Sequence, residues 1–281
     1  MDLIVIGASS GSQLDELATL TYALAAQPHA DGGWRLENAR NDAETRTQVD
    51  AWCQARRLDH AYIPPRSRLS DFTLLAMDMD STLVTIETID EIADYCGRKR
   101  EVAAITEAAM RGEITDYSES LRRRVALLEG LETSALERVY EERMRLSPGA
   151  QRLIHEAHDA GLSTLLVSGG FTFFTERLRE RLRLTFAKSN TLGIRHGRLT
   201  GEVVGEIVDA SVKARTVLDV CAQLGITADR AIAIGDGAND LKMMHAVGLS
   251  VAYRAKPVVR AQASMAFDFC GLDGLLAVLP R

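Results

Sequence analysis

The 281-residue sequence has few of the features that mark redox, membrane or nucleic-acid-binding proteins. Its four cysteines are scattered and form no Cys-x-x-Cys pair, which argues against a zinc or dithiol redox site and fits thiols kept reduced in the cytosol. No run approaches the roughly 20 apolar residues that a membrane-spanning helix needs. The first residues also lack the basic segment of a signal peptide. We therefore expect a cytoplasmic protein without a membrane partner.

Positive charge is also scarce. The 33 lysines and arginines are outnumbered by 39 aspartates and glutamates, and the net charge of −6 gives no basic surface for nucleic acid. Because a net negative protein does not attract phosphate groups, any phosphate site must be built locally. The hydrophobic share of 46% and the charged share of 26% are ordinary for a folded globular protein, which excludes a disordered or fibrous chain.

The first 70 residues form one compositional unit. An apolar run at 3–6 predicts a strand, and apolar residues with helical spacing predict a helix over 14–26. Pro64 and Pro65 then interrupt regular structure and begin a linker. A chain of 281 residues allows one large domain or two modest ones. The strand and helix patterns that precede the linker therefore predict a small α+β N-terminal domain over residues 1–70.

Residues 71–281 carry a different pattern. Near-continuous apolar runs occur at 73–77, 163–167 and 231–234, with a fourth candidate at 249–252. Such runs predict strands buried on both faces of a parallel sheet. The helical segments between them predict a doubly wound α/β domain.

Two segments interrupt this alternation. Residues 91–145 are helical throughout, which predicts a helical cap inserted into a core made of 71–90 and 146–281. Residues 186–209 alternate around a His-Gly pair, which predicts a β-hairpin.

Polar and glycine-rich segments follow the first three predicted strands. Asp78 and Asp80 come directly after the first, the Ser-Gly-Gly segment 168–170 after the second, and the Gly-Asp-Gly-Ala-Asn-Asp segment 235–240 after the third. Ligands of doubly wound sheets bind at the carboxyl ends of strands, and carboxylates from two such loops favour a hard cation such as Mg²⁺. Each segment taken singly is also explained as a glycine turn or a pair of solvated turn acids.

The ordered set resembles a known family. Four elements in sequence resemble the motifs of the haloacid dehalogenase superfamily of phosphatases: Asp-Met-Asp-Ser-Thr (78–82), Ser-Gly-Gly (168–170), Lys213 and Gly-Asp-Gly-Ala-Asn-Asp (235–240). Further similarity at 87–93, 120–125 and 165–171 makes the phosphoserine phosphatase family the closer resemblance, over about residues 70–281. Residues 1–70 resemble the N-terminal extension of proteobacterial members. The resemblance implies a Rossmann-like core with a helical cap, and hydrolysis of O-phospho-L-serine to L-serine and phosphate, the last step of serine biosynthesis.

The resemblance also implies roles for individual residues. Asp78 would be the nucleophile that forms an aspartyl phosphate. Asp80 would protonate the serine oxygen and then deprotonate water, which requires a raised pKa. Mg²⁺ would be held by Asp78, the Asp80 backbone carbonyl and Asp236. The phosphoryl oxygens would be bound by Ser168, Gly169 and Lys213. Asn239 and Asp240 would orient Lys213 and the water bound to the metal.

Substrate choice is expected to lie in the cap. On a helix over 116–128, Arg124 falls within an apolar stripe that includes Tyr117, whereas Arg122 and Arg123 point away. An arginine on a buried face needs a partner. That partner is either a protein carboxylate or, as the resemblance implies, the carboxylate of the substrate bound bidentately.

The remaining substrate contacts are implied by the same resemblance. Glu87 would pair with the substrate ammonium, while Tyr117 and Met110 would shield the site from water. Ordinary core packing explains Tyr117 and Met110 equally well.

Several alternatives stay open on the sequence alone. A phosphotransferase, or a phosphatase for another small phosphorylated metabolite, would carry the same motifs. The N-terminal segment is either a binding module for serine or a partner chain, or purely structural, and a homodimer is left open. A glycine turn at 7–12 with Tyr95 and Lys99 resembles the short-chain dehydrogenases, but its final glycine is missing and Tyr95 lies in the helical insertion.

Overall fold

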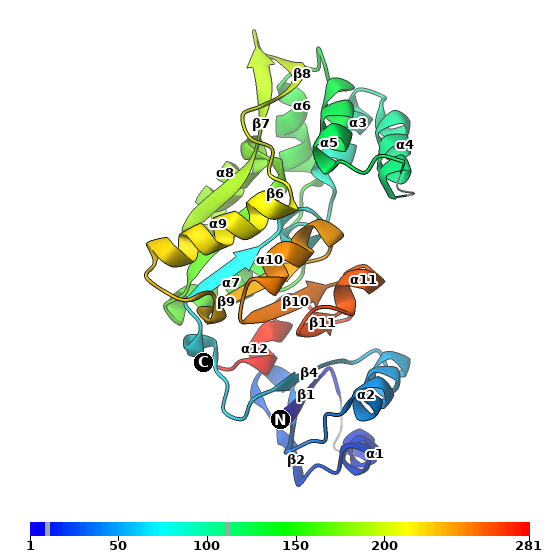
Figure 1. Ribbon diagram of the computed structural model, residues 1–281, viewed down its shortest axis with the longest axis vertical. Helices are drawn as coiled ribbons and strands as arrows, with labels where there is room; N and C mark the ends of the chain where they lie inside the picture. Colours follow the sequence, from blue (N-terminus) through cyan, green and yellow to red (C-terminus); the bar gives the residue numbers. More distant parts are fainter. Residues whose placement is uncertain (9–11, 111–112) are drawn as a thin grey trace.

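The computed structural model describes residues 1–8, 12–110 and 113–281, without the side chains of residues 12, 109 and 110. Within these residues, eleven strands form one sheet in the order β2-β3-β1-β4-β11-β10-β9-β5-β6-β7-β8 (Figure 1). The strands are β1 (Asp2–Ile6), β2 (Ala25–Pro28), β3 (Trp34–Glu37), β4 (Asp59–Ile63), β5 (Leu74–Met77), β6 (Ser163–Phe171), β7 (Phe186–Arg195), β8 (Arg198–Val204), β9 (Ala231–Gly235), β10 (Leu249–Tyr253) and β11 (Met265–Phe267).

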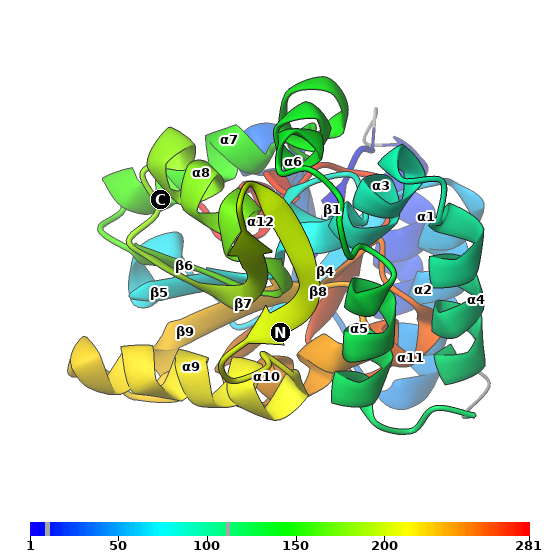
Figure 2. The same ribbon diagram turned by 90° about the horizontal axis from the view of Figure 1, so that it is seen from above.

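Helices cover both faces of this sheet (Figure 2). The α-helices are α1 (Ser12–Thr21), α2 (Ala43–Ala55), α3 (Thr88–Tyr95), α4 (Lys99–Met110), α5 (Tyr117–Ala126), α6 (Ser134–Arg138), α7 (Ala150–Asp159), α8 (Thr172–Leu182), α9 (Ala210–Gln223), α10 (Leu241–His245), α11 (Pro257–Arg260) and α12 (Gly274–Val278). Short 3₁₀ or π turns complete the description: η1 (Ala30–Gly32), η2 (Leu69–Asp71), η3 (Met79–Leu83), η4 (Val139–Arg143), η5 (Ala228–Arg230) and η6 (Ala238–Asp240).

The middle of the sheet is a parallel, doubly wound core. Strands β11, β10, β9, β5, β6 and β7 pair in parallel. Helices α7, α8 and α12 lie on one face, and α9 and α10 lie on the other (Figure 2). On β5, Leu75 and Met77 join the first hydrophobic cluster, whereas Leu74 and Ala76 join the second. Successive side chains point to opposite faces of a strand, so the continuous apolar run of the sequence fills both layers.

The N-terminal region continues the same sheet. Strands β2, β3, β1 and β4 pair antiparallel, and β4 joins β11 through the pair His60 and Ala266. One face of β1 packs its Leu3 and Val5 in a cluster with α1 and α2. The other face places Ile4 and Ile6 in the same hydrophobic cluster as α12.

The segment between β5 and β6 is helical in its described part, from α3 to η4. The hairpin expected near 186–209 is present as β7 and β8, with His196 and Gly197 at φ of 50° and 74° in its turn. Positive φ at both turn residues matches the twist of a two-residue hairpin. The predicted fold class is therefore confirmed, while the proposed domain boundaries stay a prediction.

Some elements begin or end at other residues than the sequence predicts. The helix expected over 14–26 ends at Thr21, because Tyr22 takes a left-handed φ of 51° and residues 25–28 pair with β3 as β2. The strand expected to end at 167 continues to Phe171. Short β11 was missed, since its three residues gain their strand conformation from pairing with β10.

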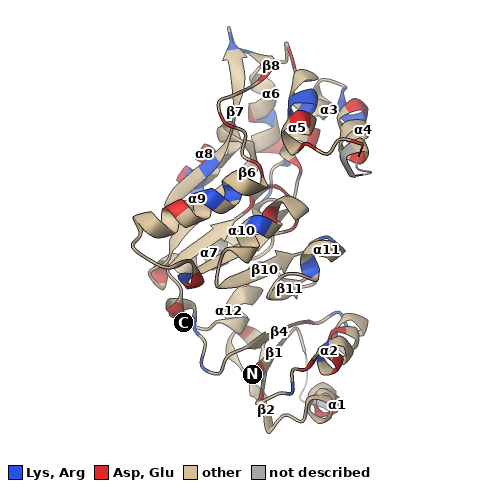
Figure 3. Cartoon of the chain, in the orientation of Figure 1, with Lys and Arg blue, Asp and Glu red and all other residues tan. Residues whose placement is uncertain are grey.

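No helix among the described residues is long and apolar enough to cross a membrane. Basic and acidic side chains occur on the same helices, as α5 and α9 show (Figure 3).

Candidate active site

The polar segments that follow β5 and β9 emerge at one edge of the sheet. These strands are parallel neighbours with Met77 opposite Ile234, so Asp78 and Asp236 come out next to each other. The Asp78 N–H donates to the Ile234 carbonyl at 3.0 Å and extends the ladder by one bond. Beyond Asp78 the chain turns through η3, where Ser81 has a left-handed φ of 54°.

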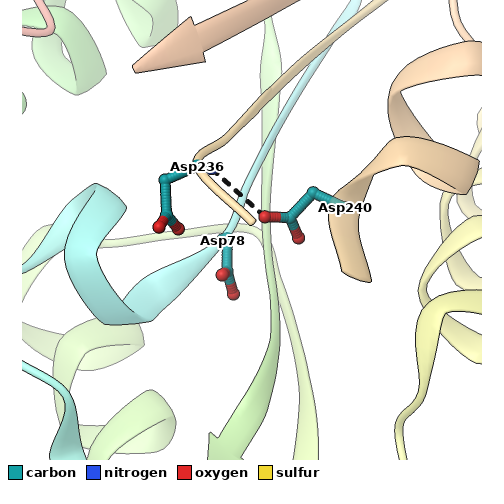
Figure 4. A group of neighbouring side chains, drawn as sticks. All are labelled: Asp78, Asp236 and Asp240. Carbon is teal, nitrogen blue, oxygen red and sulfur yellow. Dashed lines mark hydrogen bonds between the residues drawn. The ribbon is translucent and has the colours of Figure 1, made fainter. Parts of the chain in front are cut away.

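Three carboxylates meet at this edge. Oxygens of Asp78, Asp236 and Asp240 all lie within 4.8 Å of one another (Figure 4). The Asp240 Oδ2 accepts the backbone N–H of Asp236 at 3.2 Å and that of Gly237 at 3.1 Å, which fixes the loop after β9. Asp236 Oδ1 accepts from the Thr82 hydroxyl at 3.3 Å.

A buried lysine faces this cluster. Lys213, on α9, is fully buried, and its Nζ lies 2.7 Å from an oxygen of Asp78 and 2.7 Å from an oxygen of Asp240. The contact with Asp240 is a hydrogen bond. The contact with Asp78 is an ion pair without hydrogen-bond geometry, so Asp78 Oδ1 is buried with no hydrogen-bond donor among the described residues.

The carboxylates of this cluster outnumber the one cation, and the pKa values of Asp78 and Asp236 are raised. Burial, and then the charge of Asp240, raises the pKa of Asp78 to about 8 against the opposing effect of Lys213. Burial, and then Asp240, raises the pKa of Asp236 to about 6. For Lys213, burial favours the neutral form, but Asp240 and Asp78 outweigh it and raise the pKa.

This arrangement fits a bound metal ion. Buried carboxylate oxygens that converge with too little positive charge form the donor set of a hard divalent cation. The observation that supports this fit is that Asp78 and Asp240 share the single ammonium of Lys213, and that Asp78 Oδ1 has no further donor among the described residues, because buried negative charge needs compensation.

Asp80 lies in the same turn and is held by the next helix. Its Oδ1 accepts the Thr88 N–H at 3.1 Å, and its Oδ2 accepts the Thr88 hydroxyl at 3.2 Å. Burial, followed by the charges of Glu87 and Asp78, raises the pKa of Asp80 well above 3.8. The protonated form of this carboxyl is therefore favoured relative to that of a solvent-exposed aspartate.

The Ser168 segment closes the site from β6. Ser168 is fully buried, and its Oγ accepts the Gly170 N–H at 2.8 Å. A Cβ atom on residue 170 would lie 3.0 Å from Asp80 Oδ2, and one on residue 169 would overlap the Tyr117 hydroxyl. The two glycines thus let Asp80 and Tyr117 approach the backbone closely.

Two charged side chains of the helical segment differ in their partners. Glu87 is exposed at the start of α3 and accepts from the Ser81 hydroxyl at 2.6 Å. Arg124 is half-buried on α5 and donates to the Ser120 carbonyl at 3.4 Å. In the described parts of the chain Arg124 has no carboxylate within 4.0 Å, so the protein carboxylate considered in the sequence analysis is not found.

Arg122 and Arg123 are exposed on the same helix, as the helical spacing predicts. Tyr117 is half-buried, and burial raises the pKa of its phenol. The side-chain oxygen of Asn239 lies against Gly237. Met110 lies outside the described side chains.

The dehydrogenase-like residues are not assembled. Tyr95 donates to Glu142 at 2.7 Å, and Lys99 pairs with Glu91 at 3.2 Å, while residues 9–11 of the glycine turn lie outside the description.

Sequence reasoning missed three polar residues near the site. Thr88 holds Asp80, Thr82 holds Asp236, and Asn190 contacts the Ser168 segment. Thr82 and Thr88 have a local signal, since each lies within eight residues of Asp80 in a segment already singled out. Asn190 has none beyond being a polar residue within a strand.

Comparisons with known proteins agree with this geometry. The family model of haloacid dehalogenase-like hydrolases matches residues 75–245. A curated phosphoserine phosphatase of Polaromonas sp. is 58% identical over 219 residues, which is 76% of this chain and 93% of the relative. A crystal structure of a probable phosphoserine phosphatase from Vibrio cholerae has a TM-score of 0.85 and 38% identity, covering 99% of this chain and 85% of that one. A phospho-aspartyl intermediate analogue of a phosphoserine phosphatase has a TM-score of 0.69 and 36% identity, covering 74% and 99%.

Proposed function

The chain belongs to the haloacid dehalogenase-like hydrolases and, within them, to the phosphoserine phosphatases, and on that premise we propose how its own residues hydrolyse O-phospho-L-serine to L-serine and phosphate. The reaction would be the last step of serine biosynthesis. The observation that carries the proposal is Asp78, a buried carboxylate with an undonated oxygen, set beside Lys213 and two further acids.

Asp78 is assigned as the nucleophile. Its carboxylate oxygen attacks phosphorus, the bond to the serine oxygen breaks, and an aspartyl phosphate results. Water then attacks the same phosphorus and returns the carboxylate. Covalent catalysis of this kind divides one difficult displacement into two easier steps, and a phospho-aspartyl analogue is known from a structural relative.

Mg²⁺ is the metal we assign to the acidic cluster. Asp78, Asp236 and the backbone carbonyl of Asp80 would hold it. When bound, it would neutralise negative charge shared between the carboxylates and the phosphate, the main difficulty in bringing two anions together.

Asp80 is assigned as the proton donor and acceptor. A raised pKa keeps its carboxyl protonated before the first step, so it can give that proton to the departing serine oxygen. The carboxylate left behind then takes a proton from the attacking water. Thr88 holds both oxygens of Asp80 during this exchange.

The phosphoryl oxygens are assigned to Lys213, the Ser168 hydroxyl and the backbone N–H of Gly169. Lys213 keeps its charge, because Asp240 and Asp78 raise its pKa. Donors placed in advance, where charge builds up in the transition state, stabilise it without reorganisation. Asp240 orients Lys213 through the 2.7 Å hydrogen bond. Asn239, in the same loop, is assigned a supporting role beside Asp240.

The amino-acid part of the substrate is assigned to the helical segment. Arg124 lacks a carboxylate among the described residues and can accept one from the substrate. Glu87 would face the ammonium group. Tyr117 would exclude water from above Gly169, and a similar shielding role for Met110 stays a prediction.

Two measurements test the proposal. Purified protein with Mg²⁺ is expected to release phosphate from O-phospho-L-serine in preference to other phosphorylated metabolites. Borohydride reduction during turnover is expected to convert residue 78 to homoserine, detected by peptide mass. Hydrolysis without trapping at residue 78 would overturn the mechanism, and a preference for another phosphate ester would overturn the substrate.

A phosphotransferase would form the same aspartyl intermediate but pass phosphate to an added hydroxyl compound. Product analysis with amino-alcohol acceptors separates the two reactions. We also propose that the enzyme is cytoplasmic, which cell fractionation tests. Whether it forms a homodimer is measured by light scattering.

A further inference from the structure

The buried side chain of Asn190 connects two segments of the proposed phosphate site. Asn190 lies on β7 and is 0% exposed. Its Nδ2 donates to the Gly169 carbonyl at 2.7 Å, and its Oδ1 accepts the Val208 N–H at 2.8 Å. These partners fix the orientation of the amide, because a carbonyl only accepts and an N–H only donates.

The Gly169 carbonyl lies in an irregularity between β6 and β7. The register pairs on either side are Val167 with Lys188 and Phe171 with Asn190, so three residues of β6, 168–170, stand against one residue of β7. A bulge disrupts the ladder and leaves backbone groups unpaired. The Asn190 amide donates to the Gly169 carbonyl within this irregularity, and it thereby fixes the bulge that carries Ser168.

Val208 leads into the helix that carries Lys213. The next residue, Asp209, caps α9 by accepting the N–H groups of Ser211 and Val212, each at 2.8 Å. The Asp209 carbonyl also accepts the Lys213 N–H at 2.9 Å. The Asn190 bond to Val208 therefore holds the backbone immediately before the helical turn that presents Lys213.

We propose that Asn190 is a positioning residue that sets the spacing between Ser168 and Lys213. The proposal rests on the proposed function, in which both groups bind phosphoryl oxygens. The amide of Asn190 offers a donor and an acceptor at this depth, whereas an aspartate lacks the donor and a leucine lacks both. A displacement of about 1 Å at a reacting centre costs roughly 10²-fold in rate.

The test uses the full chain with Mg²⁺ and two variants, Asn190→Leu and Asn190→Asp. We expect kcat for O-phospho-L-serine to fall about 10- to 100-fold, as for other groups that support an active site. The inhibition constant of orthovanadate, which mimics the transferring phosphoryl group, should rise by a similar factor. Inhibition by L-serine, bound through the helical segment, should change by less than about twofold.

Ser189→Ala is the matched control. Ser189 precedes Asn190, and its buried hydroxyl shares a 2.7 Å hydrogen bond with Thr175. Among the described residues this hydroxyl has no hydrogen bond to residues 168–170 or to the start of α9, so its loss removes neither of the Asn190 contacts. We expect a fall in melting temperature with unchanged kcat and orthovanadate inhibition. The proposal is overturned if folded Asn190 variants keep their orthovanadate affinity, or if Ser189→Ala loses as much activity as they do.

Failure of the proposed function is distinguishable from failure of this inference. If the wild-type protein binds orthovanadate in calorimetry but does not hydrolyse O-phospho-L-serine, the substrate assignment is wrong while the variants still test Asn190. If the wild-type protein binds no orthovanadate, both are wrong.

Discussion

Asp59 and Asp78 are buried carboxylates of one sheet in opposite circumstances. Asp59, 3% exposed at the start of β4, accepts three consecutive backbone N–H groups at residues 268–270, at distances of 2.7 to 3.0 Å. Asp78, 5% exposed after β5, faces Lys213, yet its Oδ1 has no hydrogen-bond donor among the described residues. The fold satisfies the first charge with three backbone donors, whereas the second shares a single ammonium with Asp240.

The surroundings of the two residues repeat this contrast. Near Asp59, the side chain of Gln54 on α2 donates to Asp268 at 2.9 Å, so polar groups of the chain itself join the N-terminal region to the core. Near the site, Arg124 has no carboxylate within 4.0 Å in the described chain, and Asp78 Oδ1 has only the shared ammonium of Lys213. In the proposed function a metal and a substrate would complete the partners of these two groups, whereas Asp59 is satisfied by the chain itself.

The largest effect is expected from Asp78→Asn. Loss of the nucleophile should lower kcat by at least about 10⁴-fold. The urea unfolding midpoint should stay unchanged or rise, because the amide removes one of several crowded buried carboxylates while Lys213 keeps its ion pair with Asp240. Phosphate release and urea unfolding measure the two quantities. A variant that keeps hydrolysing O-phospho-L-serine would show that Asp78 is not the nucleophile.

Asp59→Asn should show the reverse pattern. An amide nitrogen directed at backbone N–H groups loses acceptors, and we expect the free energy of unfolding to fall by about 3 kcal/mol. The kcat per folded molecule should stay at the wild-type value, since Asp59 contacts none of the site residues. Equal losses of activity in the two variants would remove the distinction between the two carboxylates.

The two regions also differ in how far the sequence reveals them. Asp78 and Asp236 were predictable, because apolar runs mark buried strands and their polar ends share one edge of a parallel sheet. The role of Asp59 was not, since its partners lie more than 200 residues away in the chain and contribute only backbone groups. Asn190 and β11 also escaped, although their partners lie nearer in the chain, because these partners are backbone groups of other segments. Local patterns report what a segment does alone, whereas these features depend on which segments meet.

Arg124→Ala tests the unpaired cation. Loss of a charged hydrogen-bonding partner should cost about 2 kcal/mol, or roughly 30-fold in kcat/KM for O-phospho-L-serine, mainly through KM. Phosphoethanolamine, which has no carboxylate, should be hydrolysed as before. Arg122→Ala, at an exposed position of the same helix, is the control. Equal losses with both substrates would mean that Arg124 supports the fold of the helical segment rather than binding the carboxylate.

The smallest effect concerns pH in metal-free protein. Burial, followed by neighbouring acids, raises the pKa of Asp78 to about 8 and that of Asp236 to about 6, both above the ordinary 3.8. The folded state therefore binds protons more tightly than the unfolded state, so stability is fully present below pH 4 and is lost as pH rises toward 8. The slope for one such proton is at most about 1.4 kcal/mol per pH unit.

Urea unfolding in EDTA between pH 6.5 and 7.5 should show this slope in the wild-type protein and in Asp59→Asn, but a smaller one in Asp78→Asn. Saturating Mg²⁺ should flatten the wild-type profile, because metal binding displaces protons from its ligands. If Asp78→Asn keeps the full slope of unfolding free energy against pH without metal, the titration of Asp78 is not what distinguishes the site from the region around Asp59.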